Sequence, residues 1–532
     1  MVRRPVHDWA RDGLDAALAL LIFAACAGYL AAFPLFLGHV DEAHYLHEAK
    51  RVLAGERLYR DIFELATPGW VYLMAGLFRL FGATLSTARL AAAVIHAGTA
   101  TVLFLVCRRL GVRRGLAVAC AATYLFLCPP MFPVASQHWL VTLLGVVLLW
   151  LCQRPLAIST CVLLGLVDGL AIAMHQTRGL AMGVGVACFL VADTFLRRSN
   201  RQPAPSARLL ALAAGVLIVM VPLLGFVVAT SGLEPVWQAL VVYPTQGYTV
   251  GLTGRWGWSG SPTLSLKGLL KFLPLALLCA VPRAAGWWRP EADRDDVRAG
   301  VLLIVLGAAF IASIWYFADY IHIAFIAPLF LVAMADGVER ALRALPAHTQ
   351  MGLGWVVTVA ILAPLGVVLS NTLADERADR KNTWSYLSAF GPVEIFPSQF
   401  DPLDKLSVLL SRTPSRTLYC HPHSGYTYLL LGARNPTRFE FIRPGLPNAA
   451  ANLPDGSRHS PAQVNEVIDV LRTREVPYVQ MHPQYMKAID PIAAFIREHY
   501  ELVPDDTLRQ WGVWRRRPTR PPATMDSPTA RE

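Results

Sequence analysis

The chain has 532 residues, of which 55% are hydrophobic and 16% charged, and its formal net charge is +11. Because a soluble protein carries about 25% charged residues, this composition excludes an ordinary soluble globular protein. The hydrophobic residues occur in blocks of about 17–25 residues, the length that crosses a bilayer. We therefore predict a polytopic membrane protein in a lipid bilayer, and we interpret the positive charge as an orientation signal rather than a sign of nucleic-acid binding.

The first apolar segment, at about 14–37, follows a short basic N-terminus. It lacks a clear small-residue cleavage site, and further apolar segments come after it. These features favour a retained first membrane helix over a removed signal peptide.

A polar segment follows, HVDEAHYLHEAKRVLAGERLYRDIFELATPGW, from His39 to Trp70. Asp41 suits the N-cap of a helix over 42–54, because its carboxylate can accept hydrogen bonds from first-turn N–H groups. An apolar stripe along that helix fits a helix that lies on a membrane. His44, His47 and Glu48 superficially suggest metal binding, but His44 and Glu48 would share a helix face as an ordinary i,i+4 pair. We therefore predict no metal site.

The run TPGWVYLMAGLFRLFG, at 67–82, is apolar but short and contains Arg79. It predicts an interfacial helix rather than a span. The remaining pattern gives eleven predicted spans, at about 14–37, 87–107, 115–129, 139–153, 156–174, 179–196, 209–230, 267–282, 299–317, 321–338 and 351–371.

Arginines fall in alternate loops between these spans, for example at 108–114, 197–208 and 283–298. The positive-inside rule then places the N-terminus in the cytoplasm and the region after residue 371 on the outer face. The dense Ala, Leu and Arg usage suggests a bacterial plasma membrane.

The predicted domains are a membrane domain at 1–371, an outer soluble α/β domain at 372–515 and a disordered tail at 516–532. Within the α/β domain, short strands are predicted at 416–421, 437–442, 476–481 and 511–516. Amphipathic helices are predicted at 461–474 and 491–500.

Unusual polar residues gather in five predicted outer loops rather than in the cytoplasmic ones. Such residues form either solvated loops or the lining of a shared site. They include Asp41, Glu42 and Asp61 in the first loop, His138 in the second, His175 and Arg178 in the third, Arg255 in the fourth, and Asp319 and His322 in the fifth. Acids beside several cationic groups suit a negatively charged, lipid-linked substrate.

The sequence resembles the GT-C superfamily, in the branch of the protein O-mannosyltransferases and the lipid A aminoarabinose transferase (family 39-like). Four stretches carry the resemblance, most clearly over about residues 14–200: DEAHYLHEAKRVLAGERLYRDIF, TPGWVYLMAGLFRLFG, STARLAAAVIHAGTATVLFLVCRRLGV and MHQTRG. It implies a polytopic helical fold with interfacial helices in the first outer loop and a small C-terminal α/β domain.

The resemblance also implies a sugar transfer from a polyprenyl-phosphate donor, with inversion at the anomeric carbon. Asp41 occupies the position of the family's base, with Glu42 as its neighbour. A single displacement needs one carboxylate within reach of the acceptor hydroxyl. A helix cap is the alternative role for Asp41, and the two roles are compatible.

The leaving phosphate needs cationic or hydrogen-bonding partners. Family members often place a lysine before the proline of the interfacial helix, where this chain has Thr67. Arg178 is the first choice instead, because its planar guanidinium suits phosphate, although it could equally face lipid headgroups. His175 and Arg255 come next. Asp319 and His322 resemble a D-x-x-H pattern of bacterial members, with structural pairing as the alternative.

No cofactor is predicted. The expected partners are the lipid-linked donor, the bilayer and a lipid, glycan or protein acceptor that the sequence does not specify. The alternative function is a transporter or flippase of lipid-linked saccharides. Transporters place polar residues at mid-membrane and often show two related halves, whereas here polar residues gather at one face. A scaffold protein would not explain polar residues in five separate loops.

Overall fold

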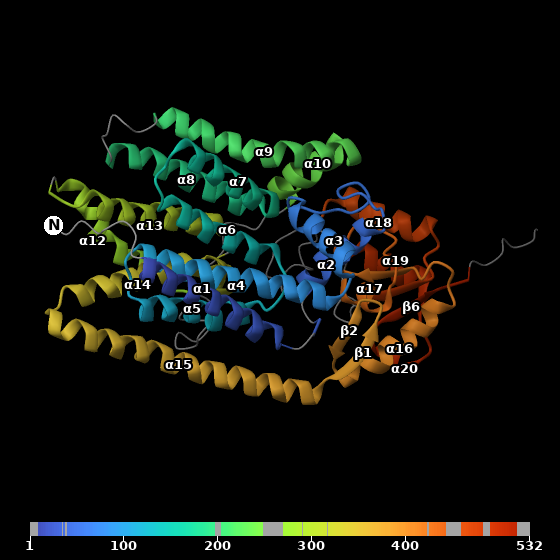
Figure 1. Ribbon diagram of the computed structural model, residues 1–532. Coiled ribbons are helices and arrows are strands. Elements are labelled where there is room, and N and C mark those ends of the chain that lie inside the picture. The colour runs from blue at the N-terminus through green and yellow to red at the C-terminus, as the bar shows by residue number, and fades with distance from the viewer. Residues whose placement is uncertain are drawn as a thin grey trace, which may run out of the picture.

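The computed structural model places a bundle of membrane helices at one end of the molecule and a mixed α/β domain at the other (Figure 1). The structure describes residues 9–33, 36–37, 40–196, 204–247, 270–289, 291–315, 318–422, 425–442, 459–481 and 490–518.

Each of the eleven predicted spans has an apolar helix at its position, so the prediction of a polytopic helical membrane protein is confirmed. Eight of these helices are long and apolar enough to cross a membrane. The other three, α6, α7 and the segment Leu273–Trp288, are shorter. The ten long bundle helices are α1 (Trp9–Ala31), α4 (Leu85–Arg109), α5 (Arg114–Leu127), α6 (Gln137–Cys152), α7 (Ile158–Met174), α8 (Gln176–Leu196), α9 (Pro205–Ser231), α13 (Arg294–Ser313), α14 (Tyr320–Arg343) and α15 (Ala347–Asn382).

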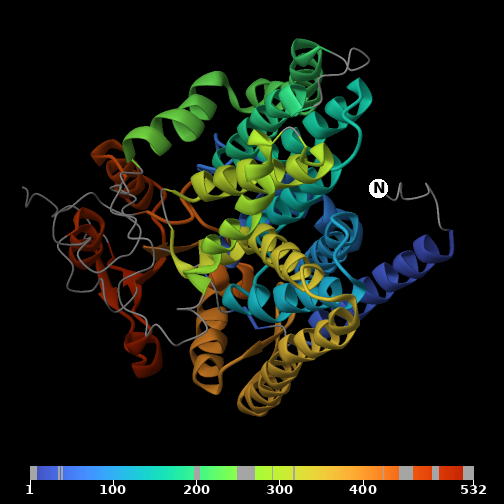
Figure 2. The same cartoon turned by 90° about the vertical axis from the view of Figure 1, so that its left-hand side faces the viewer.

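Helices α1 and α15 lie at the periphery of the bundle, as the end-on view shows (Figure 2). Only 11% of the most apolar window of each is buried, so lipid is their main neighbour. By contrast, 72% of the corresponding window of α14 is buried. Helix α14 therefore lies at the centre of the bundle, where it packs on several neighbouring helices.

The segment between α1 and α4, predicted as the first outer loop, forms α2 (Val40–Leu53) and α3 (Gly69–Phe81). Helix α3 has 13 residues, too few to cross a bilayer, as predicted for an interfacial helix. The cap prediction for Asp41 needs correction, because α2 begins at Val40 and Asp41 lies in its first turn. A carboxylate there still faces the positive end of the helix dipole.

Gly69 lets α3 approach the end of α7 closely. A Cβ atom at this position would lie 2.5 Å from the carbonyl oxygen of Ala173. Any larger residue would therefore push the two helices apart. Helix α3 lies beside α2 at the end of the bundle that faces the α/β domain (Figure 1).

The C-terminal domain contains a four-stranded sheet in the order β3-β4-β6-β5 and a separate β1-β2 hairpin. Strands β3 and β4 are parallel and the other pairs antiparallel. The elements are β1 (Trp384–Ser388), β2 (Gly391–Ile395), α16 (Pro397–Ser411), β3 (Leu418–His421), α17 (Gly425–Leu431), α18 (Pro461–Thr473), β4 (Tyr478–Met481), α19 (Pro491–His499), β5 (Tyr500–Leu502), α20 (Asp506–Gln510) and β6 (Val513–Arg516).

Three of the four predicted strands and both predicted helices of this domain are present. The exception is 437–442, where the structure has isolated bridges instead of a strand, one of them between Phe439 and Phe63, which lies between α2 and α3. The alternating apolar pattern there reflects packing against the membrane domain rather than a sheet. Helix α15 continues past residue 371, the predicted domain boundary, to Asn382.

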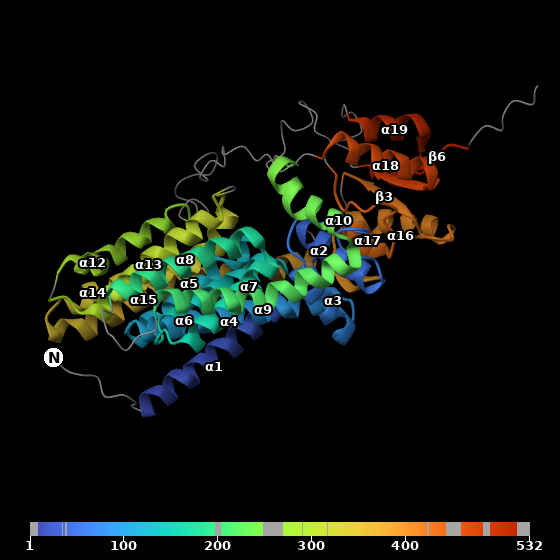
Figure 3. The ribbon, with the colours of Figure 1, turned by 90° about the horizontal axis from the view of Figure 1, so that it is seen from above.

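A second connection to this domain follows α9. Helix α10 (Leu233–Trp237) and the helical segment Gln238–Gly247 extend toward the C-terminal domain (Figure 3). The ring of Tyr243 lies 5.1 Å from that of Phe63 and 5.1 Å from that of His459. The C-terminal domain is therefore connected to the bundle through α15 and contacted by the segment after α9.

Candidate active site

Helix α2 is anchored to the bundle by Glu42, whose side chain is fully buried. Its carboxylate accepts hydrogen bonds from Arg89 at 2.8 Å and from the Ala135 N–H at 2.7 Å. Burial raises the pKa of Glu42, and the Arg89 charge and the Ala135 N–H oppose that rise. With both oxygens engaged, Glu42 positions α2 rather than facing an open space.

Asp41, the residue before it, is exposed. Its charge acts on Tyr45, one helical turn along α2. Burial raises the pKa of Tyr45 well above its usual value, and the carboxylates of Glu64 and Asp41 raise it further. Tyr45 also pairs with Gln137 at the start of α6. The phenol therefore stays protonated, between the candidate base and the membrane helices.

A buried acid–histidine cluster lies on the same helix and consists of His44, Glu48 and Glu64. His44 Nε2 lies 3.1 Å from Glu48 Oε1 and 3.2 Å from Glu64 Oε2. Burial lowers the pKa of His44, but the two carboxylates outweigh it and raise that pKa well above its usual value. Burial and the Glu64 charge raise the pKa of Glu48.

The three side chains of this cluster each offer one ligand atom, and these atoms lie within 4.8 Å of one another. One imidazole and two carboxylates are a donor set that a divalent cation such as Zn²⁺ accepts. The same distances also suit hydrogen bonds from His44 to the carboxylates of Glu48 and Glu64. For His44 and Glu48, such a pair is what the i,i+4 spacing predicts. The prediction of no metal stays a prediction.

The residues before α3 bind the junction between α7 and α8. The Thr67 N–H donates to Gln176 Oε1 at 3.0 Å, and Gln176 Nε2 donates to the Leu65 carbonyl at 2.8 Å. The Thr67 hydroxyl donates to the Ile172 carbonyl at 2.6 Å. The position where relatives often carry lysine is therefore occupied by a threonine that serves packing.

Three of the predicted histidines meet where the start of α6, the end of α7 and the start of α14 lie together. The ring of His138 lies 4.8 Å from that of His175 and 5.8 Å from that of His322. The Asp319 carboxylate caps α14 and lies 2.7 Å from His322 Nδ1. Four residues from three predicted loops are thus brought together, and we call them the histidine cluster.

The histidine cluster has hydrogen-bonding capacity that its described neighbours do not use. Among the described residues, His138 Nδ1, His175 Nδ1 and Gln137 Oε1 are buried and have no hydrogen-bond partner. Buried polar atoms in native proteins are nearly always paired. A polar ligand at this position would supply the missing partners. Gln137 joins this cluster to Tyr45, so the two groups line one region.

Arg178 is fully buried beneath the histidine cluster. Its guanidinium donates to the His138 carbonyl at 2.8 Å and to the Phe325 carbonyl at 3.3 Å. These contacts join α6, α8 and α14 just below the histidine rings. Its positive charge therefore acts on the cluster from within the protein.

The C-terminal domain packs on α2 from the side opposite the helical bundle. Glu440 lies 2.7 Å from His47 Nδ1 and 2.6 Å from Arg51 Nη1. The His47 ring stacks on the ring of Tyr428 in α17, with 4.9 Å between the two ring centroids. A Cβ atom at Gly425, the first residue of α17, would lie 2.8 Å from the Ala43 backbone. The helix that carries Asp41 is therefore clamped between bundle and domain.

Asp61, another predicted site residue, lies in a turn. It accepts a hydrogen bond from the Arg57 N–H at 2.9 Å and lies 3.9 Å from Arg60 Nε. These contacts close a turn between α2 and α3. The predicted site residue Arg255 lies outside the described residues.

Sequence reasoning missed Arg89, Tyr45 and Glu440 as partners of this region. Arg89 lies in the stretch STARLAAAV, where a lone arginine at the start of an apolar helix is a usable signal. Tyr45 is one turn after Asp41, so helical spacing could have found it. Glu440 lies 393 residues after its partner His47, and no local pattern connects them.

No model of a known protein family matches this sequence, and no curated protein matches it either. Among solved structures, the chain is similar to ArnT from Cupriavidus metallidurans. The crystal structure of ArnT bound to undecaprenyl phosphate matches with a TM-score of 0.52 and 17% identity, over 96% of this chain and 98% of that one. Its apo state matches with a TM-score of 0.53 and 17% identity, over 95% and 97%. The chain therefore has the ArnT fold over nearly its whole length, as the GT-C resemblance predicts.

Proposed function

We propose that this protein is a membrane glycosyltransferase that moves a sugar from a polyprenyl-phosphate donor to an acceptor at the outer face of the membrane. The observation that carries the proposal is the similarity of nearly the whole chain to the fold of ArnT. One crystal structure of ArnT contains bound undecaprenyl phosphate. The clustering of polar groups at one end of the bundle supports it, because a lipid-linked substrate reaches that end from the bilayer.

Asp41 is the proposed base. It is exposed in the first turn of α2, whereas the adjacent Glu42 is buried and engaged by Arg89 and Ala135. The acceptor hydroxyl would transfer its proton to Asp41 while its oxygen forms a bond to the anomeric carbon. The bond between that carbon and the phosphate oxygen would break on the opposite side, which inverts the anomeric centre. Glu42 acts in this scheme as a positioning residue.

The histidine cluster is the proposed site for the leaving phosphate. The phosphate needs hydrogen-bond donors where its charge develops. Each imidazole can carry a hydrogen on Nδ1, and Nδ1 of His138 and Nδ1 of His175 are buried there without a hydrogen-bond partner among the described residues. Arg178 adds a permanent positive charge from below and holds the backbone of His138 in place. In this assignment Arg178 acts through the cluster instead of replacing the absent lysine.

Mass spectrometry of envelope glycans and glycolipids tests the proposal whichever sugar is transferred. Cells that express the wild-type protein should carry a sugar modification that is absent without the protein and absent with Asp41→Asn. If Asp41→Asn restores the modification fully, the base assignment is wrong. The alternative outcome is that cells with and without the protein carry the same glycans and glycolipids. If cells without it then accumulate a lipid-linked saccharide on one face of the membrane, the protein is a flippase.

A further inference from the structure

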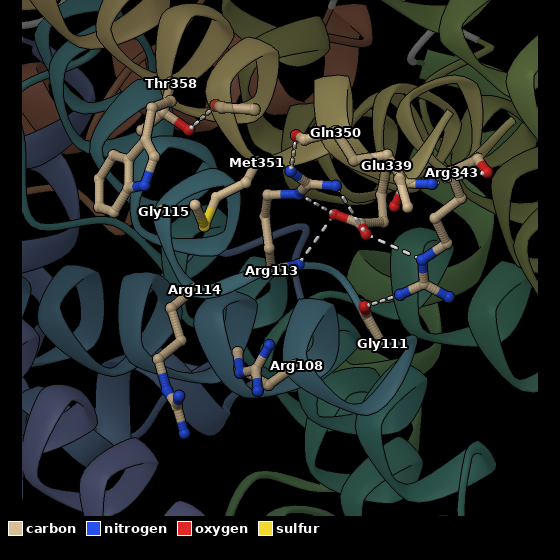
Figure 4. A pocket seen from close by; sticks show the side chains of 13 residues that line it. Arg108, Gly111, Arg113, Arg114, Gly115, Glu339, Arg343, Gln350, Met351 and Thr358 are labelled. Atoms are coloured by element: carbon tan, nitrogen blue, oxygen red, sulfur yellow. Dashed lines mark hydrogen bonds and ion pairs between the residues drawn. The ribbon is translucent and has the colours of Figure 1, made fainter. Parts of the chain in front are cut away.

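A basic pocket lies at the end of the helical bundle remote from the α/β domain. It has a volume of about 630 Å³ and is formed where the turn between α4 and α5 meets the turn between α14 and α15 (Figure 4). Four arginines line it: Arg108, Arg113, Arg114 and Arg343. This pocket is at the opposite end from the candidate active site, so its role is separate from the proposed sugar transfer.

The lining of the pocket is rich in positive charge. Glu339 is the acid in its lining and contacts both Arg113 and Arg343 at 2.8 Å. Asp15 of α1 contacts Arg108 at 3.0 Å and Arg114 at 2.6 Å. Each of these two carboxylates, within the described part of the chain, is therefore shared between two guanidinium groups. An anion in the pocket would add a further negative charge to this array.

The arginines are held in place but remain partly accessible. The exposed fraction of their side chains runs from 21% for Arg108 to 46% for Arg343. In the described part of the chain, Arg343 uses its Nε and one Nη nitrogen, toward Glu339 and the Gly111 carbonyl. Its other Nη nitrogen can therefore donate to an added acceptor. The side chain of Arg113 packs against Gly354 of α15. A Cβ atom at Gly354 would collide with Nη1 of Arg113.

The other wall of the pocket is apolar and belongs to the peripheral helix α15. Met351 and Trp355 line the pocket, and their exposed fractions are 74% and 64%. Both lie in the first turns of a helix whose most apolar window is only 11% buried. An occupant can thus place a charged group on the arginines and an apolar chain along α15. A free phosphate ion would use only the first of these features.

We propose that this pocket binds an anionic membrane phospholipid, with its phosphate on the arginines and an acyl chain along Met351 and Trp355. Guanidinium groups suit phosphate because their planar forks donate paired hydrogen bonds. Basic pockets between membrane helices are known places for anionic headgroups. The lipid would hold α15, which leads directly into the C-terminal domain, against α5 and α14.

Native mass spectrometry of the purified full-length protein tests the proposal. The protein is stripped of lipid in detergent and then titrated separately with phosphatidylglycerol, phosphatidylcholine and inorganic phosphate. The expected result is retention of one phosphatidylglycerol, with little retention of phosphatidylcholine. Arg114→Gln combined with Arg343→Gln should weaken that retention about 100-fold, because a charged hydrogen bond contributes roughly tenfold per arginine.

Two further variants keep the result interpretable. Arg109→Gln is the matched control, because Arg109 lies at the same turn but stacks on Trp150 outside the pocket lining. Ala347→Trp should fill the pocket while leaving every arginine in place, and it should reduce retention as the double variant does. Equal retention by the double variant or by Ala347→Trp would overturn the proposal. So would equal binding of phosphatidylcholine, or thermal stabilisation by inorganic phosphate as large as that by phosphatidylglycerol.

Discussion

The carboxylate of Glu440, in the C-terminal domain, lies 2.7 Å from Nδ1 of His47 on the interfacial helix α2. Both side chains are buried, and the second oxygen of Glu440 accepts from Arg51 at 2.6 Å. Asp41 lies on the same helix as His47 and Arg51. The C-terminal domain therefore contributes directly to the placement of the proposed base, although no residue of that domain is proposed to act on the substrate.

Replacing Glu440 by Gln should destabilise the protein by about 3 kcal/mol, because it removes the buried carboxylate that His47 and Arg51 share, although Arg51 keeps its contact with Glu56. Thermal unfolding in detergent, followed by tryptophan fluorescence, measures the change. Glu466→Gln is the matched control. Glu466 pairs with Arg438 but is 40% exposed, and such pairs contribute about 0–1 kcal/mol. Equal losses in the two variants would contradict the clamp between Glu440 and α2.

The same residue predicts how stability depends on pH. Burial raises the pKa of Glu440, but His47 and Arg51 outweigh it and hold that pKa below its ordinary value of 4.5. A carboxyl whose pKa is lower in the folded state stabilises the fold above the unfolded pKa. That stabilisation is lost as the pH falls from about 4.5 toward the folded value. The melting temperature should therefore fall with acid more steeply for the wild type than for Glu440→Gln. Parallel curves would rule out this linkage.

The cluster of His44, Glu48 and Glu64 gives a prediction about metals. Because the carboxylates raise the pKa of His44 well above its usual value, a proton occupies the position that a cation would need. We expect the purified protein to contain less than one bound metal ion per chain, and incubation with EDTA to leave its melting temperature unchanged. Elemental analysis of wild type and Glu48→Gln measures this. A stoichiometric metal that is lost in Glu48→Gln would show that the cluster is a metal site.

Gly69 provides a test of the packing that supports the site. Gly69→Val should destabilise the protein by about 1–3 kcal/mol, the usual cost of overpacking, because its Cβ would collide with the Ala173 carbonyl. Gly76→Ala in the same helix is the control, since a Cβ there meets nothing within 4 Å. Alanine should stabilise the helix by up to about 1 kcal/mol. Thermal unfolding compares the two, and a harmless Gly69→Val would mean that α3 does not rest on α7.

The parts of the fold that sequence reasoning found are those with a local signal. The apolar blocks gave the positions of the helices, and the shortness of 67–82 gave the interfacial helix α3. The alternate arginine loops placed His138, His175, Asp319 and His322 on one face, and the structure brings these residues together. A topological rule was sufficient there, because each residue lies at the end of a membrane helix whose direction is fixed by its neighbours.

The parts that sequence reasoning missed depend on contacts between distant segments. The stretch 437–442 has the alternation of a strand, but Phe439 packs on Phe63 and Glu440 pairs with α2. Glu42 and Asp41 have different surroundings, because Glu42 is buried against Arg89 and Ala135 whereas Asp41 is exposed. The composition of a loop does not show which of two adjacent acids turns inward, since that depends on the helices behind it.

The release of undecaprenyl phosphate from an undecaprenyl-phosphate sugar donor, measured in membranes that contain the protein, tests the central claim most directly. A panel of hexose and pentose donors identifies one that the wild-type protein consumes with inversion. For that donor, Asp41→Asn should lower the rate by about 10²–10⁴-fold, the usual contribution of a general base. It should leave the melting temperature close to that of the wild type, because Asp41 is exposed. A folded Asp41→Asn protein that releases undecaprenyl phosphate at the wild-type rate would contradict the account.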